Sequence, residues 1–108
     1  MSGSSGSSGG IGFSSGASSC DSLVITTQLN SPKPAVVERI DVGDELDVRT
    51  MQVGSTTTVV AMFGGDLAGG IASPDLQRLR ECIADGTHYV ATVIGKSDGQ
   101  VTVRVGAR

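Results

Sequence analysis

All charged side chains of this chain lie after residue 20, and this asymmetry limits what can fold. Residues 1–20 are mostly serine and glycine, and beyond Met1 only Ile11 and Phe13 offer large apolar side chains. Burial of so little apolar surface does not offset the entropy cost of ordering the segment. We therefore predict a disordered Gly/Ser-rich tail or linker over residues 1–20 and a single compact domain over residues 21–108.

The charge balance and the aromatic content narrow the classes of partner. Eight basic and eleven acidic side chains give a formal net charge of -3, which argues against affinity gained by bulk neutralisation of phosphates. Phe13, Phe63 and Tyr89 are the only aromatic residues other than His88, so few rings are present on which nucleic-acid bases could stack. No apolar run reaches the ~18 residues of a membrane span, and no signal peptide is recognisable, so we expect no membrane partner and a cytoplasmic location.

Several segments alternate apolar and polar residues, which is typical of strands with one buried face. The pattern is clear in Leu46 and Val48, which alternate with charged residues, and in Val101, Val103 and Val105. Glycine, proline, asparagine and aspartate punctuate the segments, and Gly54-Ser55 predicts a hairpin. The expected strands cover residues 22–29, 45–51, 56–63, 67–72, 89–94 and 101–105.

Two segments show helical signals. Pro34 can occupy the first position of a short helix over about residues 34–40. Ser73-Pro74 predicts the N-cap and first residue of a main helix over about residues 74–85, and Gly86 predicts its end. The order of elements favours an α+β fold, mostly β: a small barrel-like antiparallel sheet of five to six strands with one main helix.

The two cysteines leave two interpretations open. Cys20 precedes the first expected strand and Cys82 lies on the apolar stripe of the main helix, so a Cys20–Cys82 disulfide would close a long loop. The alternative is a buried free thiol at Cys82 and a free thiol without a structural role at Cys20, which a reducing compartment favours. The disulfide would instead indicate a secreted protein.

No complete catalytic or metal-binding set can be assembled. His88 is the only histidine, and a Cys82–His88 nucleophile pair requires an exposed thiol on a helical stripe that is expected to pack. The glycines between residues 64 and 70 lack the Lys-Ser/Thr of a P-loop, so they favour turns and close strand packing. The acids between residues 41 and 47 alternate with apolar residues, which is typical of a solvated strand face. We expect no cofactor and no metal.

A few basic residues on strands suggest a binding surface. If the strands that carry Arg49 and Arg104 place them on one outer face, with Tyr89 and Lys96 nearby, these four residues would form an anionic-ligand patch. A mixed-charge solubilising surface is the simpler interpretation.

Residues 43–105 show a further pattern. The stretch Gly43-Asp44-Glu45-Leu46-Asp47-Val48, then Val59-Val60-Ala61, Gly69-Gly70-Ile71, the helix at 76–83 and the strand from Tyr89 resemble the HIRAN domain in order. The HIRAN domain is a small barrel found beside helicases and in mobile-element proteins. The resemblance implies a barrel fold and an association with DNA ends, although residues 54–58 replace the family's Asn/Asp-bearing loop.

Three functional hypotheses follow. The first is a non-catalytic binding or adaptor module whose partner is a protein or a nucleic acid. The second is an interaction or assembly subunit that acts through a sheet edge, including self-association. The third is an enzyme that depends on Cys82 and His88.

Overall fold

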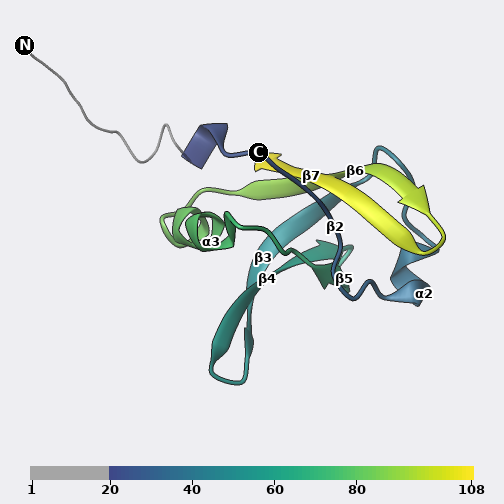
Figure 1. Cartoon of the computed structure of the whole chain (residues 1–108), viewed down its shortest axis with the longest axis horizontal. Coiled ribbons are helices and arrows are strands. Elements are labelled where there is room, and N and C mark those ends of the chain that lie inside the picture. The colour runs from purple at the N-terminus through teal and green to yellow at the C-terminus, as the bar shows by residue number, and fades with distance from the viewer. Residues whose placement is uncertain (1–19) are drawn as a thin grey trace, which may run out of the picture.

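The computed structural model describes residues 20–108, so the predicted tail lies outside the described residues except for Cys20. Every expected strand is present, with ends shifted by a few residues (Figure 1). The elements in chain order are β2 (Ile25–Gln28), α2 (Pro34–Val37), β3 (Glu45–Val53), β4 (Thr56–Phe63), β5 (Asp66–Gly70), α3 (Leu76–Ala84), β6 (Tyr89–Ser97) and β7 (Gln100–Ala107).

The six strands form one antiparallel sheet in the order β2-β7-β6-β3-β4-β5. The expected hairpin between β3 and β4 is confirmed, with continuous register from Asp47↔Met62 to Val53↔Thr56. Two further hairpins join β4 to β5 and β6 to β7. The predicted α+β fold, mostly β, is therefore confirmed.

The alternation of each strand sets two faces of the sheet. Residues that face one another across the ladders, such as Leu46↔Ala91 and Ala91↔Val105, share the inner face and are buried. Glu45, Thr92 and Arg104 form a row on the outer face. Together with α2 and α3, the inner face encloses a core that is made almost entirely of aliphatic side chains. This matches the core expected from a chain with few aromatic residues.

The sheet is not closed into a barrel, so the barrel-like description holds only loosely. A single bridge joins the chain after β2 to the end of β5: Asn30 and Gly70 exchange two main-chain hydrogen bonds of 2.8 Å. Gly69 lies beside this bridge, and the absence of a side chain there lets the β5 main chain approach Leu29 closely.

Helix α3 begins two residues later than the sequence predicted. The Leu76 N–H bonds to the Ser73 carbonyl three residues back, which makes a turn and not a helical start. The Ser73 hydroxyl accepts the Asp75 N–H at 3.1 Å and so stabilises this turn. Gly86 ends the helix as predicted: its φ is +103°, and the Gly86 and Thr87 N–H groups cap the Ile83 and Cys82 carbonyls.

Helix α2 is shorter than the predicted span of residues 34–40 and ends at Val37. It still buries Val36 and Val37, and Ile40 is fully buried in the turn that follows. The Lys33 N–H donates to the Ala68 carbonyl at 2.9 Å, so the start of α2 is attached to β5.

The approach of Gly69 to Leu29 makes a matched pair of substitutions informative. A Cβ at Gly69 would lie 3.0 Å from Leu29 Cβ and 3.2 Å from the Asn30 oxygen. Both neighbours are fixed by main-chain bonds, so we expect Gly69→Ala to destabilise the fold by about 1–3 kcal/mol in urea denaturation. Gly70→Ala, whose Cβ would have no neighbour nearer than 3.7 Å, is the control and should be neutral or stabilising. Equal unfolding midpoints for the two variants would contradict this account.

Candidate functional site

The structure divides the four residues of the predicted anionic-ligand patch. Arg49 on β3 and Arg104 on β7 share the outer face, but β6 lies between their strands. Arg104 is in the row of Glu45, four residues along β3 from Arg49. From strand spacing and rise, the two Cα atoms are roughly 16 Å apart. One small anion cannot contact both side chains.

Tyr89 and Lys96 lie elsewhere and are held by main-chain carbonyls. Tyr89 is on the inner face, 3 % exposed, and its hydroxyl donates to the Cys20 carbonyl at 2.6 Å. The Lys96 ammonium donates to the Ile40 carbonyl at 2.7 Å. Both side chains therefore stabilise the fold, and the four residues do not make one patch.

The two cysteines are joined. A disulfide links Cys20 to Cys82 with their Cα atoms 5.6 Å apart, and both residues are buried. It attaches the chain just before β2 to α3, so the packed domain begins one residue earlier than the predicted boundary. The sulfur that a Cys82–His88 pair would need as a thiolate is bonded to Cys20.

The glycine and acidic clusters have structural roles. Gly64 and Gly65 form the turn between β4 and β5. The Asp44 carboxylate accepts the Asp41 N–H at 2.9 Å and stabilises the turn before β3. Within residues 20–108, no three His, Cys, Asp or Glu side chains are grouped to hold a metal ion.

The far half of β3 has a partner on one side only. Pairing between β3 and β6 runs from Glu45↔Thr92 to Asp47↔Val90, whereas pairing between β3 and β4 continues to Val53. Figure 1 shows the β3–β4 hairpin extending away from the other strands. We call residues 49–53 on the β6 side of β3 the open β3 edge.

The hydrogen-bond pattern identifies which main-chain groups face this edge. The carbonyls of Thr57 and Val59 point away from β3, because they accept Arg80 Nη1 at 3.2 Å and the Ile71 N–H at 2.9 Å. Their cross-strand neighbours are Gln52 and Thr50. In an antiparallel ladder, residues directly opposite point their main-chain groups either toward each other or away from each other. The N–H and C=O groups of Thr50 and Gln52 therefore face the open β3 edge.

Two hollows of ≈ 670 and ≈ 710 Å³ adjoin this edge, in the size range of ligand clefts. The first is bordered by Asp47, Arg49, His88 and Arg108, with Tyr89 in its lining. The second lies between the tip of the β3–β4 hairpin and α3. Thr50 and Ile83 line both hollows. We call them together the β3–α3 groove.

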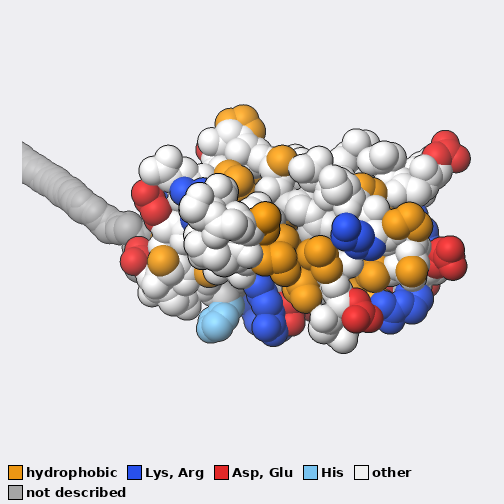
Figure 2. Space-filling view, turned by 90° about the horizontal axis from the view of Figure 1, so that it is seen from below, with side chains coloured by type: hydrophobic (Ala, Val, Ile, Leu, Met, Phe, Trp, Pro, Cys, Tyr) orange, Lys and Arg blue, Asp and Glu red, His pale blue; other side chains and the backbone are white. Residues whose placement is uncertain are grey.

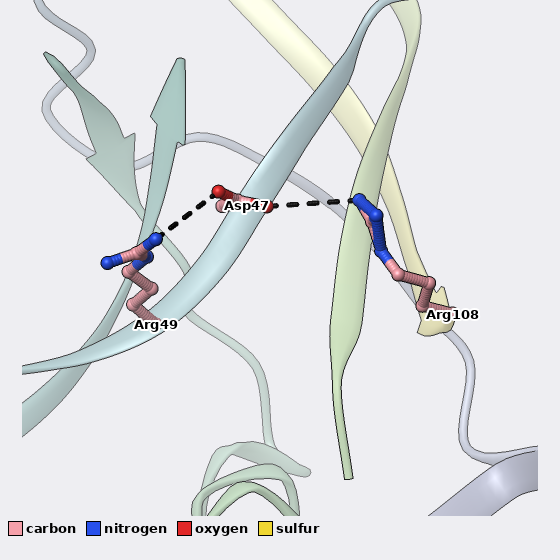
Figure 3. Close-up of polar contacts among 3 residues, drawn as sticks. All are labelled: Asp47, Arg49 and Arg108. Atoms are coloured by element: carbon pink, nitrogen blue, oxygen red, sulfur yellow. Dashed lines mark hydrogen bonds and ion pairs between the residues drawn. The ribbon is translucent and has the colours of Figure 1, made fainter. Parts of the chain in front are cut away.

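Three charged side chains border the outer end of the groove. The Asp47 carboxylate lies between two guanidinium groups, 3.5 Å from Arg49 and 3.8 Å from Arg108 (Figure 3). Both distances exceed the 2.7–2.9 Å of a strong charge-assisted bond, and all three side chains are more than half exposed. Figure 2 shows the histidine projecting beside basic side chains on this side of the molecule. Two of these three side chains are basic and one is acidic, although acidic side chains outnumber basic ones in the chain as a whole.

Sequence reasoning identified Arg49 but missed Arg108 and Thr50. Arg108 reaches the groove because its N–H bonds to the His88 carbonyl at 2.8 Å, which extends the β6–β7 pairing by one residue. That position follows from long-range pairing and has no local signal. Thr50 was recognisable as a strand residue, but the absence of a neighbour on one side was not.

Comparison of the chain with protein-family models, curated proteins and solved structures finds no match. The resemblance of residues 43–105 to the HIRAN domain therefore stays a prediction. No helix among residues 20–108 is long and apolar enough to cross a membrane.

The disulfide should carry a large part of the stability of this small domain. Cys20 and Cys82 are 62 residues apart in sequence, and closing such a loop stabilises a fold by about 4 kcal/mol in the chain-entropy model. We expect the reductant dithiothreitol to lower the free energy of unfolding by about that amount in urea titrations. The Cys20→Ser/Cys82→Ser double variant should have the same lowered free energy of unfolding, and dithiothreitol should not change it. An oxidised and a reduced protein of equal stability would refute the prediction.

Titration of the single tyrosine, Tyr89, tests the packing of the core beside the disulfide. Burial, together with the negative charge of Asp21, raises the pKa of Tyr89 above its ordinary value of 10.0, and the nearby Arg78 lowers it less. Because the neutral phenol is favoured in the folded state, this contribution to stability is complete below pH 10 and is lost as the pH rises through the raised pKa. Phenolate absorbance should show a higher midpoint in native than in urea-unfolded protein, and Asp21→Asn should lower the native midpoint. A native midpoint at or below the unfolded one would disprove the assignment.

Proposed function

We propose that this domain is a non-catalytic binding module that takes an extended segment of a protein partner as an added strand on the open β3 edge. The observation that carries the proposal is the direction of the Thr50 and Gln52 main-chain groups, which face the groove with no strand of residues 20–108 beside them. Such groups recruit an extended chain and bond to its main chain.

The open β3 edge has few of the devices that usually block strand addition. Natural edges are shortened, bent by bulges, or interrupted by proline and charge. Residues 49–53 carry one charged side chain and no proline, and the β3–β4 register is continuous along them. By contrast, β2 has only four residues and its far end is bridged to Gly70. The β3 edge is therefore the more accessible template.

A nucleic-acid partner, which the HIRAN resemblance implies, has less support from the geometry. Single strands bind where aromatic rings stack on bases. Of the two rings in residues 20–108, Tyr89 is buried and Phe63 is covered by the Arg39 guanidinium at 5.6 Å. The separation of Arg49 from Arg104 also leaves no continuous basic track between them.

Substitution of Thr50 tests the proposal, because its N–H faces the open edge and not β4. The probes are three capped heptapeptides in which valine alternates with glutamate, serine or lysine. We expect at least one to bind in isothermal titration calorimetry and to slow exchange of the Thr50 and Gln52 amides. Thr50→Pro removes the edge donor without breaking a bond to β4, so binding should fall at least ten-fold. Thr50→Ala keeps the N–H and should bind as the native chain does.

Two results would overturn the proposal. The first is that no peptide of the set binds, or that the Thr50 and Gln52 amides are already protected in the free protein. The second is a concentration-dependent dimer in sedimentation that Thr50→Pro abolishes, because a second copy of the chain would then occupy the edge.

A further inference from the structure

We infer that the open β3 edge selects an acidic partner strand, one whose residue opposite Arg49 carries a carboxylate and whose next residue is apolar. This inference rests on the proposed strand addition and identifies the chemistry of the partner. It is carried by the register of the edge and by the charges and apolar groups on its two sides.

The register determines which side of the sheet each partner residue faces. Directly opposite residues in an antiparallel pair have side chains on the same face. Arg49 lies on the outer face with Asp47, two residues away on the same strand, and Thr50 lies on the inner face toward α3. A partner residue opposite Arg49 therefore projects outward, and the residue opposite Thr50 projects inward, toward the side of the sheet on which α3 lies.

The two guanidinium groups on the outer side of the edge are incompletely paired. One carboxylate, Asp47, serves both Arg49 and Arg108 at 3.5 and 3.8 Å. Elsewhere in the molecule, Arg39 and Asp66 form an ion pair of 2.7 Å, which shows how close a satisfied exposed pair lies. Two guanidinium groups that share one carboxylate retain donors for a second carboxylate, so Arg49 can pair with an acidic side chain placed opposite it.

The inner side of the edge accepts a small apolar side chain. Ile83 of α3 lines both hollows beside Thr50 and is only partly buried. The charges of this side, Arg80 and Glu81, are opposite in sign. An acid directed outward and an apolar residue directed inward give a partner strand of alternating acidic and apolar residues.

The first twenty residues of the chain do not have this chemistry. They contain no acidic side chain and only two large apolar ones beyond Met1. The charge of the groove border therefore favours a strand from a different protein over the chain's own N-terminal segment.

Reversal of one charge tests the inference with the same peptides. In the native protein we expect the glutamate–valine peptide to bind about five-fold more tightly than the serine–valine peptide, the effect of a cross-strand ion pair. The lysine–valine peptide should bind more weakly than both. Arg49→Glu should reverse the order and favour the lysine–valine peptide. Arg104→Glu makes the same charge change on the same face outside the groove and should leave the order unchanged.

The outcomes separate this inference from the proposed function. Equal binding of all three peptides, with the Thr50 amide protected, overturns the acidic preference and leaves strand addition standing. No binding of any peptide overturns both. Salt-dependent binding of a short single-stranded or duplex DNA that Arg49→Glu removes, without binding of the glutamate–valine peptide, would assign the arginines to phosphate and overturn the acidic peptide.

Discussion

The close approach of the β5 main chain to Leu29 and Asn30 is the contact on which the shape of the domain depends. It brings the two ends of a six-stranded sheet together at a single bridge. A sheet reaches that geometry only by strong bending, and register shifts in β4–β5 and β6–β7 supply the bends. Pairing between β3 and β6 ends at Asp47 and Val90 because β6 begins at Tyr89 and the chain before it comes from α3. The open β3 edge is therefore the part of β3 that extends beyond the start of β6.

The disulfide compensates for a core with few large side chains. Aliphatic residues form nearly all of the buried cluster, and Tyr89 is its only ring that is fully buried. A domain of this size buries a modest fraction of its surface and is marginal without added constraints. The Cys20–Cys82 bond and the Tyr89 hydrogen bond to Cys20 both fix the chain before β2 against α3 and β6. These contacts hold α3 in position as one wall of the β3–α3 groove.

The local parts of this fold could be predicted from sequence, and the long-range parts could not. Alternation identified the strands, and Gly86 identified the end of α3, because both depend on neighbours within a few residues. Tyr89 was expected near Arg49 and Arg104 in the predicted patch, yet the parity it shares with Ala91 places it inside. Arg108 and the open β3 edge depend on which strands pair and where pairing stops. Neither has a local signal in the sequence, and the bridge at Gly70 is indicated there only by two adjacent glycines.

An open edge carries a risk of indiscriminate pairing, and the position of Arg49 bears on that risk. A strand edge without charge would accept many extended chains, including copies of itself. A second copy aligned antiparallel on the same edge would bring two Arg49 side chains to nearby positions, and like charges across a ladder are destabilising. The same guanidinium attracts a carboxylate. One side chain on residues 49–53 therefore opposes self-pairing and favours an acidic partner, which explains how the edge can stay open without proline or a bulge.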